Sequence, residues 1–454
     1  MTVEGLTINS LKKKDLLTLG FMMFSIYFGA GNLIFPPALG QAAGDHTLHA
    51  MLGFMTTGIG LPLLGITAIA LAGGEYVPLL HAKTWPRFAT VLLVILYLII
   101  GPLFAMPRTG AVSFEIGIRP FLSADNLALG QIIYTAIFFA SSYYLALNPN
   151  KIIDRVGRML TPALLIVLLI LFVQAFHAPL GAILPATGAY INAPFAQGFQ
   201  DGYQTMDLLA SIAIGALVAN AVRMRGITDS RAVGAACLVS GLITVMLMAA
   251  VYGSLAYIGA TSTSVLGQAE NGGQILSAAV GIFFGSAGNL LLAVIIGLAC
   301  LTTCCGITSS AAMFFNKLLK GRISYERLLL FSILFSFAAS NVGLTQIIAL
   351  AIPFLVTIYP LIIVFVILSL FDRFIGWRKS IYQGAMALTL VFSFIDGLHA
   401  AGLSSEPVHA LLVAYIPFYN IMMGWVCPAV IGALVGLAVS FFQTAPAAAK
   451  ESQV

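Results

Sequence analysis

Residues 28–37 read Phe28-Gly29-Ala30-Gly31-Asn32-Leu33-Ile34-Phe35-Pro36-Pro37 and lie in an apolar run long enough to cross a membrane. In a helix interior, a glycine costs about 1 kcal/mol relative to alanine and a proline about 3 kcal/mol. Lipid offers no hydrogen bonds to the backbone groups that a helix break frees. An opened helix at membrane depth therefore has to line a cavity walled by protein, as it does in secondary transporters. We expect a discontinuous first helix, and the pattern favours a carrier.

The composition of the chain indicates a membrane protein. Of its 454 residues, 60% are hydrophobic and 8% are charged, and the mean hydropathy is +1.01. A soluble domain has about 25% charged residues. Apolar stretches of about 20 residues or more predict an all-α integral membrane protein with twelve transmembrane helices. These lie at 16–43, 51–73, 86–106, 129–147, 152–176, 194–222, 232–258, 286–316, 327–345, 346–371, 381–403 and 411–438.

The distribution of lysine and arginine supports this count and predicts the orientation. Twelve spans place 19 of the 21 basic residues on one side of the membrane and only Arg108 and Arg119 on the other. Cytoplasmic loops carry the excess of positive charge, so both termini are expected in the cytoplasm. The net charge of +5 is the ordinary topology signal and predicts no nucleic-acid partner.

The sequence contains little that resembles a catalytic or metal centre. Its five cysteines all lie within predicted spans, without the spacing of a disulfide framework or a metal site, and its six histidines lie near span ends or in loops. We therefore expect a protein that is not an enzyme and has no organic cofactor. No obligate protein partner is evident.

A second interrupted helix is expected in the sixth span. Residues 195–207 read Phe195-Ala196-Gln197-Gly198-Phe199-Gln200-Asp201-Gly202-Tyr203-Gln204-Thr205-Met206-Asp207, which is too polar for a helix facing lipid. A carboxylate in mid-span is a functional candidate by default, whereas an acid at a helix start caps its free amides. We favour function for Asp201 and the capping role for Asp207.

Interruptions in the first and sixth spans are what an inverted repeat of five helices produces. The chain is then one membrane transport domain, 1–454, with a first repeat at 16–176, an inverted second repeat at 194–371, and two additional helices at 381–442. A half-helix that begins at mid-membrane presents free amides and about +0.5 of an elementary charge, and one that ends there presents free carbonyls. A zwitterionic amino acid fits these two poles, and no lysine or arginine is expected in mid-span.

Four segments together resemble one family of carriers. They are 20–24 running into 29–37, 101–110, 198–207, and Ala299-Cys300-Leu301-Thr302-Thr303. This series is similar to the bacterial branched-chain amino acid:cation symporters of the BrnQ type, over nearly the whole chain. The resemblance implies import of leucine, isoleucine and valine with sodium by alternating access across the bacterial cytoplasmic (inner) membrane. It also implies the five-plus-five inverted repeat of the amino acid, polyamine and organocation carriers, shared with the neurotransmitter:sodium symporters.

The more distant resemblance to those sodium symporters implies a sodium site. Its five oxygen ligands are the carbonyls of Ser25, Phe28 and Ala299 and the hydroxyls of Thr302 and Thr303. Hard oxygen donors suit a hard cation. Hydroxyls in a membrane helix also bond a carbonyl one turn earlier or hold helices together, which is the alternative for these two threonines. A second cation site at Asn32 and Asp201 lacks its matching asparagine in the seventh span.

The substrate site is expected at the two interruptions. It comprises Gly29, Ala30, Gly31, Asn32, Phe199, Gln200, Asp201, Tyr203, Gln204 and Thr205. Phe28, Phe199, Tyr203 and Tyr97 are candidates for the apolar wall that an aliphatic side chain needs. Arg108 either pairs with Asp201 or Glu115 as an outer gate or forms a helix-end ion pair. The alternative function is a proton-coupled carrier, with the proton on Asp201, or a passive carrier of related small neutral amino acids.

Overall fold

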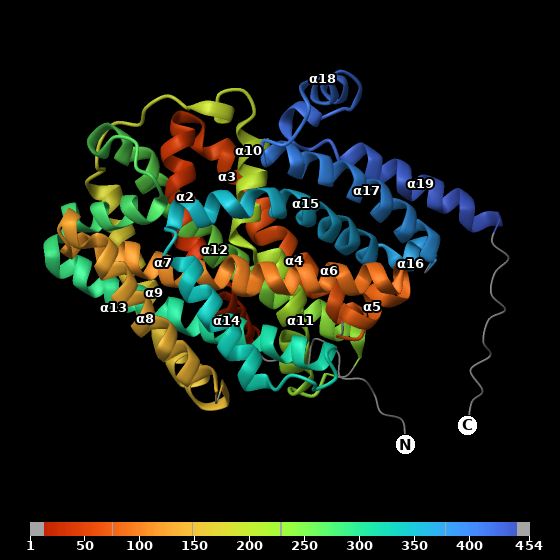
Figure 1. The fold of residues 1–454 in the computed structure, drawn as a ribbon, viewed down its shortest axis with the longest axis horizontal. Helices are drawn as coiled ribbons and strands as arrows, with labels where there is room; N and C mark the ends of the chain where they lie inside the picture. The colour runs from red at the N-terminus through yellow and green to blue at the C-terminus, as the bar shows by residue number, and fades with distance from the viewer. Residues whose placement is uncertain (1–12, 75, 148, 228, 377, 443–454) are drawn as a thin grey trace.

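The computed structural model describes residues 13–442 apart from 75, 148, 228 and 377, and these residues form helices with no β-strand among them (Figure 1). The α-helices are α1 (Lys13–Tyr27), α2 (Ala30–Ala43), α3 (Thr47–Met55), α4 (Leu61–Leu71), α5 (Tyr76–Lys83), α6 (Pro86–Leu98), α7 (Ala105–Gly117), α8 (Leu127–Ala146), α9 (Pro149–His177), α10 (Pro194–Asp201), α11 (Asp207–Arg223), α12 (Ser230–Leu266), α13 (Gly272–Leu318), α14 (Tyr325–Ser340), α15 (Leu344–Leu370), α16 (Asp372–Ile375), α17 (Lys379–Ala400), α18 (Glu406–Tyr415) and α19 (Val426–Phe442). Shorter helical turns are η2 (Gly44–His46), η3 (Thr56–Gly60), η4 (Ile99–Leu103), η5 (Arg119–Phe121), η6 (Ala124–Asn126), η7 (Gly188–Tyr190), η8 (Gly202–Thr205) and η9 (Tyr419–Ile421).

Several of these helices are long and apolar enough to cross a membrane. Within the described residues there are seven such helical runs, or eight if one bent pair counts as a single span. The seven are Ala30–Leu71, Pro86–Phe121, Ala124–Ala146, Ser230–Leu266, Gly272–Leu318, Leu344–Leu370 and Lys379–Ala400, and the bent pair is Pro194–Ala213 with Leu217–Arg223, at 47°. The all-α membrane class is confirmed. The count of twelve and the five-plus-five repeat remain predictions.

The predicted interruption of the first span is present. Helix α1 ends at Tyr27, and α2 begins at Ala30 after two non-helical residues, Phe28 and Gly29, which we call the first break. Gly29 is extended, with φ −128° and ψ −166°. Pro36 and Pro37 lie inside α2, so the glycine position rather than the prolines interrupts the helix.

The sixth span is also interrupted as predicted. Helix α10 ends at Asp201, η8 follows, and Met206 adopts a left-handed conformation with φ +62° before α11 begins. We call Gly202–Met206 the second break. A left-handed methionine is uncommon, and here it lies between the two half-helices. Both breaks are thus features of the fold.

The third predicted span, 86–106, ends too early. The chain passes from α6 through η4, where Gly101 is non-helical and Pro102 follows, and continues in α7 as far as Gly117. All thirteen residues of α7 are buried. Arg108, in α7, therefore lies inside the protein and not in an outer loop. Backbone carbonyl groups of Gln204 and Thr205 accept hydrogen bonds from its guanidinium, which offsets the cost of burying the charge.

The twelfth predicted span, 411–438, is wrong as one helix. It divides into α18 and α19, joined by residues 416–425, in which Phe418 and Met422 are left-handed. Pro417 lies in this connection and cannot donate a helical hydrogen bond. Helix α19 packs on α17 through glycines: a methyl group on Gly432 would lie 2.3 Å from the carbonyl oxygen of Gly384. Such close backbone approach is typical of small residues in membrane helices.

The interrupted helices lie in the interior of the bundle. Helix α2 packs against α12 and α13, α10 against α3, and α7 against α13. Twelve of the fourteen residues of α2 are buried. Helices α17 and α19 lie side by side, and α17 packs on α15, away from α2 (Figure 1). The arrangement surrounds both breaks with protein, as an opened backbone requires.

A buried ion pair joins two segments outside the spans. The Nζ of Lys83, at the end of α5, lies 2.8 Å from both carboxylate oxygens of Asp372, at the start of α16. Both side chains are more than 90% buried, and the ammonium lies 5.0 Å from the centre of the Tyr382 ring. Burial lowers the pKa of Lys83 from its ordinary value, while the Asp372 carboxylate acts in the opposite direction.

Removing one partner of this pair should be more harmful than removing both. We expect Lys83→Met or Asp372→Leu alone to destabilise the protein by about 3–5 kcal/mol, because each leaves a buried charge unpaired. The double variant should regain most of this loss in thermal unfolding in detergent. Arg225→Ala, which disrupts the more exposed Arg225–Asp15 pair, is the control and should cost about 1 kcal/mol or less. Additive losses in the double variant would contradict the expected coupling.

Candidate functional site

The first break presents the start of α2 to the interior of the protein. Gly29, at the N-cap position, has no side chain with which to cap the helix. The first amides of a helix have no partner within it, and here they belong to Ala30, Gly31 and Asn32, all of which are buried. The start of α2 is therefore a buried positive pole, as the sequence predicts.

A hydrogen-bonded triad connects the two breaks. The Asn32 amide nitrogen donates to Oδ2 of Asp207 at 2.9 Å and to the hydroxyl of Tyr252 at 2.7 Å, and the Tyr252 hydroxyl lies 3.5 Å from the same Oδ2. These residues come from α2, α11 and α12 and are at most 4% exposed. Met206 occupies the N-cap position of α11, and Asp207 is the first residue of that helix. Our expectation of a cap is wrong, because the Asn32 amide group, across the two breaks, is its partner.

Arg108 of α7 lies at the second break. Its Nη1 donates to the carbonyl oxygen of Gln204 at 2.5 Å, and its Nη2 lies 3.5 Å from the carbonyl oxygen of Thr205. The guanidinium also lies 5.2 Å from the centre of the Phe35 ring and approaches α2: a methyl group on Gly31 would be 2.9 Å from Nη2. Arg108 is 5% exposed. A buried arginine thus lies between the breaks, where we expected no basic residue.

In this conformation Arg108 pairs with neither Asp201 nor Glu115, the two acids named as its partners in an outer gate. Glu115, one expected partner, instead accepts hydrogen bonds from Arg119, Asn271 and Gln274 at 2.6, 3.2 and 2.9 Å. Asp201, the other, accepts from the Tyr190 hydroxyl and from Gln197. Arg108 turns inward because the second break offers it carbonyl groups that have no helical partner.

One of the residues expected to bind sodium, Thr303, lies at the first break. A methyl group on Gly29 would lie 3.4 Å from Cγ2 and 3.6 Å from Oγ1 of Thr303, so α13 contacts α2 at that point. The hydroxyl of Thr302 donates to the carbonyl of Ala299 at 2.9 Å, which is the local bond that a threonine in a membrane helix commonly makes. Ser25 lies in α1, and Phe28 is the residue where α1 has just ended.

Three predicted substrate residues of the second break are buried close to the triad and Arg108. Gln204 and Thr205 present their carbonyl groups to Arg108, and Thr205 also accepts a hydrogen bond from the Asp207 amide at 3.3 Å. Tyr203 stacks on Tyr359 of α15 with ring centres 4.4 Å apart. Phe199 packs edge-on against Tyr203, and its carbonyl accepts a hydrogen bond from Thr57 at 2.6 Å.

Two other predicted residues point elsewhere. The Gln200 side chain donates to the carbonyl of Ile421 in η9 at 2.6 Å. Asp201 is held by Tyr190 of η7 and Gln197 of its own helix. Of the predicted wall residues, Tyr97 stacks on Phe314 at 4.0 Å and Phe28 on Phe24 at 5.1 Å. Asp207, not Asp201, is the acid that the structure brings to the first break.

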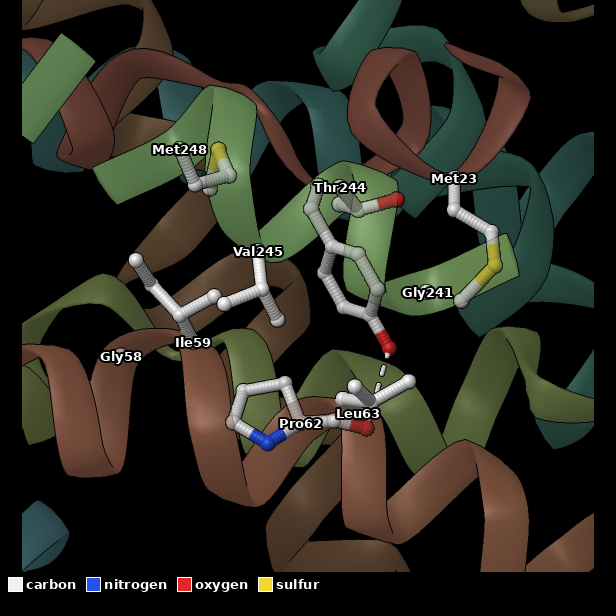
Figure 2. A pocket seen from close by; sticks show the side chains of 10 residues that line it. Met23, Gly58, Ile59, Pro62, Leu63, Gly241, Thr244, Val245 and Met248 are labelled. Carbon is white, nitrogen blue, oxygen red and sulfur yellow. Dashed lines mark hydrogen bonds between the residues drawn. The ribbon is translucent and has the colours of Figure 1, made fainter. Parts of the chain in front are cut away.

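An apolar cavity borders the second break (Figure 2). Gly58 contributes to its wall and also approaches Thr205 and Tyr252, since a methyl group on Gly58 would lie 3.6 and 3.7 Å from them. The lining is contributed by α1, η3, α4 and α12, as Met23, Tyr27, Gly58, Ile59, Pro62, Leu63, Gly241, Thr244, Val245 and Met248.

The geometry combines a helix start, a buried arginine, a buried carboxylate and a row of hydroxyl groups around two opened helices. Such a site can bind both charges of a small zwitterion without a chemical reaction. Within the described residues, no group of three or more acidic, cysteine or histidine side chains could hold a metal ion. The fold and the site define a multi-pass membrane carrier with discontinuous helices.

Sequence comparison identifies the family. A family model described as "Branched-chain amino acid transport protein" matches residues 12–443, so the chain belongs to this family of transporters and is not an enzyme. It is 46% identical to the branched-chain amino acid permease BraB of Bacillus subtilis, with 96% of this chain and 97% of that protein covered. It is 44% identical to the branched-chain amino acid transport system 2 carrier protein of Pseudomonas aeruginosa, with 92% and 94% covered.

Solved structures resemble the chain in fold. Mhp1, a nucleobase-cation-symport-1 family transporter in a closed conformation, matches with a TM-score of 0.57 at 14% identity, covering 94% of this chain and 92% of that one. MhsT in complex with L-phenylalanine matches with a TM-score of 0.54 at 17% identity, covering 93% and 98%. The resemblance to transporters with this architecture therefore extends over nearly the whole molecule.

Filling the space at Gly31 should displace the buried arginine. We expect Gly31→Ala to lower the affinity for leucine by about tenfold, the effect of losing one charge-assisted hydrogen bond, because its methyl group would lie 2.9 Å from Nη2 of Arg108. Gly253→Ala is the matched control, since a methyl group there meets nothing within 4 Å. Competition for labelled leucine measures both. Equal affinities in the two variants would show that Gly31 does not position Arg108.

Proposed function

We propose that the protein imports leucine, isoleucine and valine together with sodium by alternating access across a bacterial cytoplasmic membrane. The proposal adds the coupling ion and the mechanism to the branched-chain amino acid transport that defines the family. The observation that carries it is the contact of Thr303 with Gly29 at the first break. This contact brings the Thr303 hydroxyl group close to the first break, which supports a cation site there.

The proposed sodium site uses only neutral oxygen donors. Its ligands are the carbonyls of Ser25, Phe28 and Ala299 and the hydroxyls of Thr302 and Thr303. Helix α1 ends at Tyr27, and the end of a half-helix carries partial negative charge. Such a site supports binding of a hard monovalent cation. Because the same break starts α2, a bound cation and a bound carboxylate would stabilise each other.

Alternating access and the orientation complete the proposal. Both termini are proposed to be cytoplasmic, with twelve spans arranged as two inverted repeats, 16–176 and 194–371, followed by two helices within 381–442. The two half-helices that end in the interior support a binding point near the midplane that either side can reach in turn. Proton coupling is the alternative mechanism, and the experiment below separates the two.

Reconstituted liposomes test the coupling ion. With the membrane voltage clamped by potassium and valinomycin and with pH equal on both sides, an inward sodium gradient should drive leucine to an internal concentration above the external one. The same vesicles with a proton gradient and no sodium should only equilibrate leucine. Accumulation that follows the proton gradient and ignores sodium would refute the sodium proposal, and equilibration under both gradients would indicate a passive carrier.

The ligands are tested one hydroxyl at a time. Thr302→Ala and Thr303→Ala should each raise the sodium concentration for half-maximal leucine uptake by about tenfold, the effect of losing a contact to a charged group worth about 1.5 kcal/mol. Thr308→Ala is the control on the same helix, because its hydroxyl bonds the Cys304 carbonyl at 2.6 Å and is not a proposed ligand. An unchanged sodium dependence in both test variants would exclude these hydroxyls as ligands.

A further inference from the structure

Two buried side chains of opposite charge face the breaks and are not in contact with each other. Arg108 and Asp207 are 5% and 4% exposed. Each lies within electrostatic range of the other, yet the ion pairs found among the described residues do not include them. Buried charges are costly unless they are paired. Because these two side chains form no ion pair with each other, a bound molecule that carries both a positive and a negative charge can pair with each of them.

The surroundings of Arg108 favour an anion beside it. Its guanidinium lies against Gly31 in the first turn of α2, so a positive side chain and the positive pole of a helix are adjacent. Two such positive groups repel each other unless an anion lies between them. A helix start by itself already favours binding of an anion. The contacts to the Gln204 and Thr205 carbonyls use Nη1 and Nη2, whereas the buried Nε has no hydrogen-bond partner.

The surroundings of Asp207 favour a cation in the same way. The hydrogen bonds from Asn32 and Tyr252 both go to Oδ2, and the Thr205 side chain also bonds the carboxylate. These bonds orient the carboxylate, and they come from neutral groups that do not cancel its charge. An ammonium group is a compact cation with three donors and suits such a carboxylate.

We propose that Arg108 and Asp207 together recognise the two charged ends of the substrate, Arg108 binding its carboxylate through Nε and Asp207 binding its ammonium. This inference rests on the amino acid transport proposed above and adds the residues that read the zwitterion. A guanidinium is suited to a carboxylate by its planar fork of donors, and the Gln204 and Thr205 carbonyls hold that fork in place. The site then accepts free amino acids and rejects analogues that lack either charge.

Two leucine analogues separate recognition from mere structural support. Leucinamide keeps the ammonium and lacks the carboxylate, and 4-methylpentanoate keeps the carboxylate and lacks the ammonium. Competition with labelled leucine, at saturating sodium and fixed pH, gives the affinity of each. In the unmodified protein both analogues should bind at least about tenfold more weakly than leucine, because each leaves a buried charge without its partner.

Arg108→Gln should lower the affinity for leucine by about tenfold or more and leave the affinity for leucinamide unchanged. Asp207→Asn should lower the affinity for leucine and spare 4-methylpentanoate. Arg108→Lys keeps the charge without the fork and should fall between Arg108→Gln and the unmodified protein. Arg119→Gln is the matched control, since Arg119 pairs with Glu115 away from the breaks, and its ratio of leucine to leucinamide affinity should not change.

An equal loss of leucine and leucinamide affinity in Arg108→Gln would overturn the proposal, since it would show that Arg108 only supports the second break. Thermal unfolding in detergent establishes that each variant is folded. If Arg108→Gln fails to fold, the ratio in Arg108→Lys decides, and a ratio equal to that of the unmodified protein refutes the proposal. If leucine uptake by the unmodified protein does not depend on sodium, only the proposed coupling is refuted. The ratio of leucine to leucinamide affinity is a separate measurement and still tests the roles of Arg108 and Asp207.

Discussion

The structure depends on one constraint: backbone groups freed inside a membrane protein must find partners within the protein. At the second break, the carbonyl groups of Gln204 and Thr205 are satisfied by Arg108 from α7. At the first break, the Asn32 side chain, in the opening turn of α2, connects to Asp207 and Tyr252. Helix α7 therefore supplies hydrogen bonds to backbone carbonyl groups at the second break, and α11 and α12 bind a side chain of the opening turn at the first break. The two interrupted helices are therefore stable only because α7, α11 and α12 pack around them.

The sequence predicted the breaks well because their signal is local. Glycine and asparagine within an apolar run, and a run of polar residues in the sixth span, reveal an interruption without knowledge of the partners. The position of Arg108 was missed because a charged residue after Pro107 reads as the end of a span, and only the carbonyl groups of a segment 96 residues away explain its burial. The roles of Asp201 and Asp207 were misjudged for a similar reason. Both are acids in one polar segment, and local sequence does not show which of them meets Asn32.

The comparisons and the site geometry support different parts of the functional account. Similarity over more than nine-tenths of the chain defines a branched-chain amino acid transporter, and the solved structures support the architecture. The charges and hydroxyl groups at the breaks bear on how the chain recognises a zwitterion and a cation. They are concentrated on α2, α7, α11 and α13, whereas α17 packs on α15, and α19 on α17, at the edge of the bundle (Figure 1). Recognition is thus built into the interior around the interrupted helices.

The long sequence separations of these contacts have a consequence for biosynthesis. Arg108 meets Gln204 across 96 residues, Asn32 meets Asp207 across 175 and Tyr252 across 220, and Lys83 meets Asp372 across 289. At about 5–20 residues per second, the ribosome needs about 15–60 s to make the chain between Lys83 and Asp372. For Arg108 and Gln204, 96 residues apart, the same rate gives about 5–19 s, so polar groups of the early helices enter the membrane seconds before their partners exist. During that interval water, lipid headgroups or the insertion machinery must accommodate them, and the site is completed only once α12 and α13 have been made.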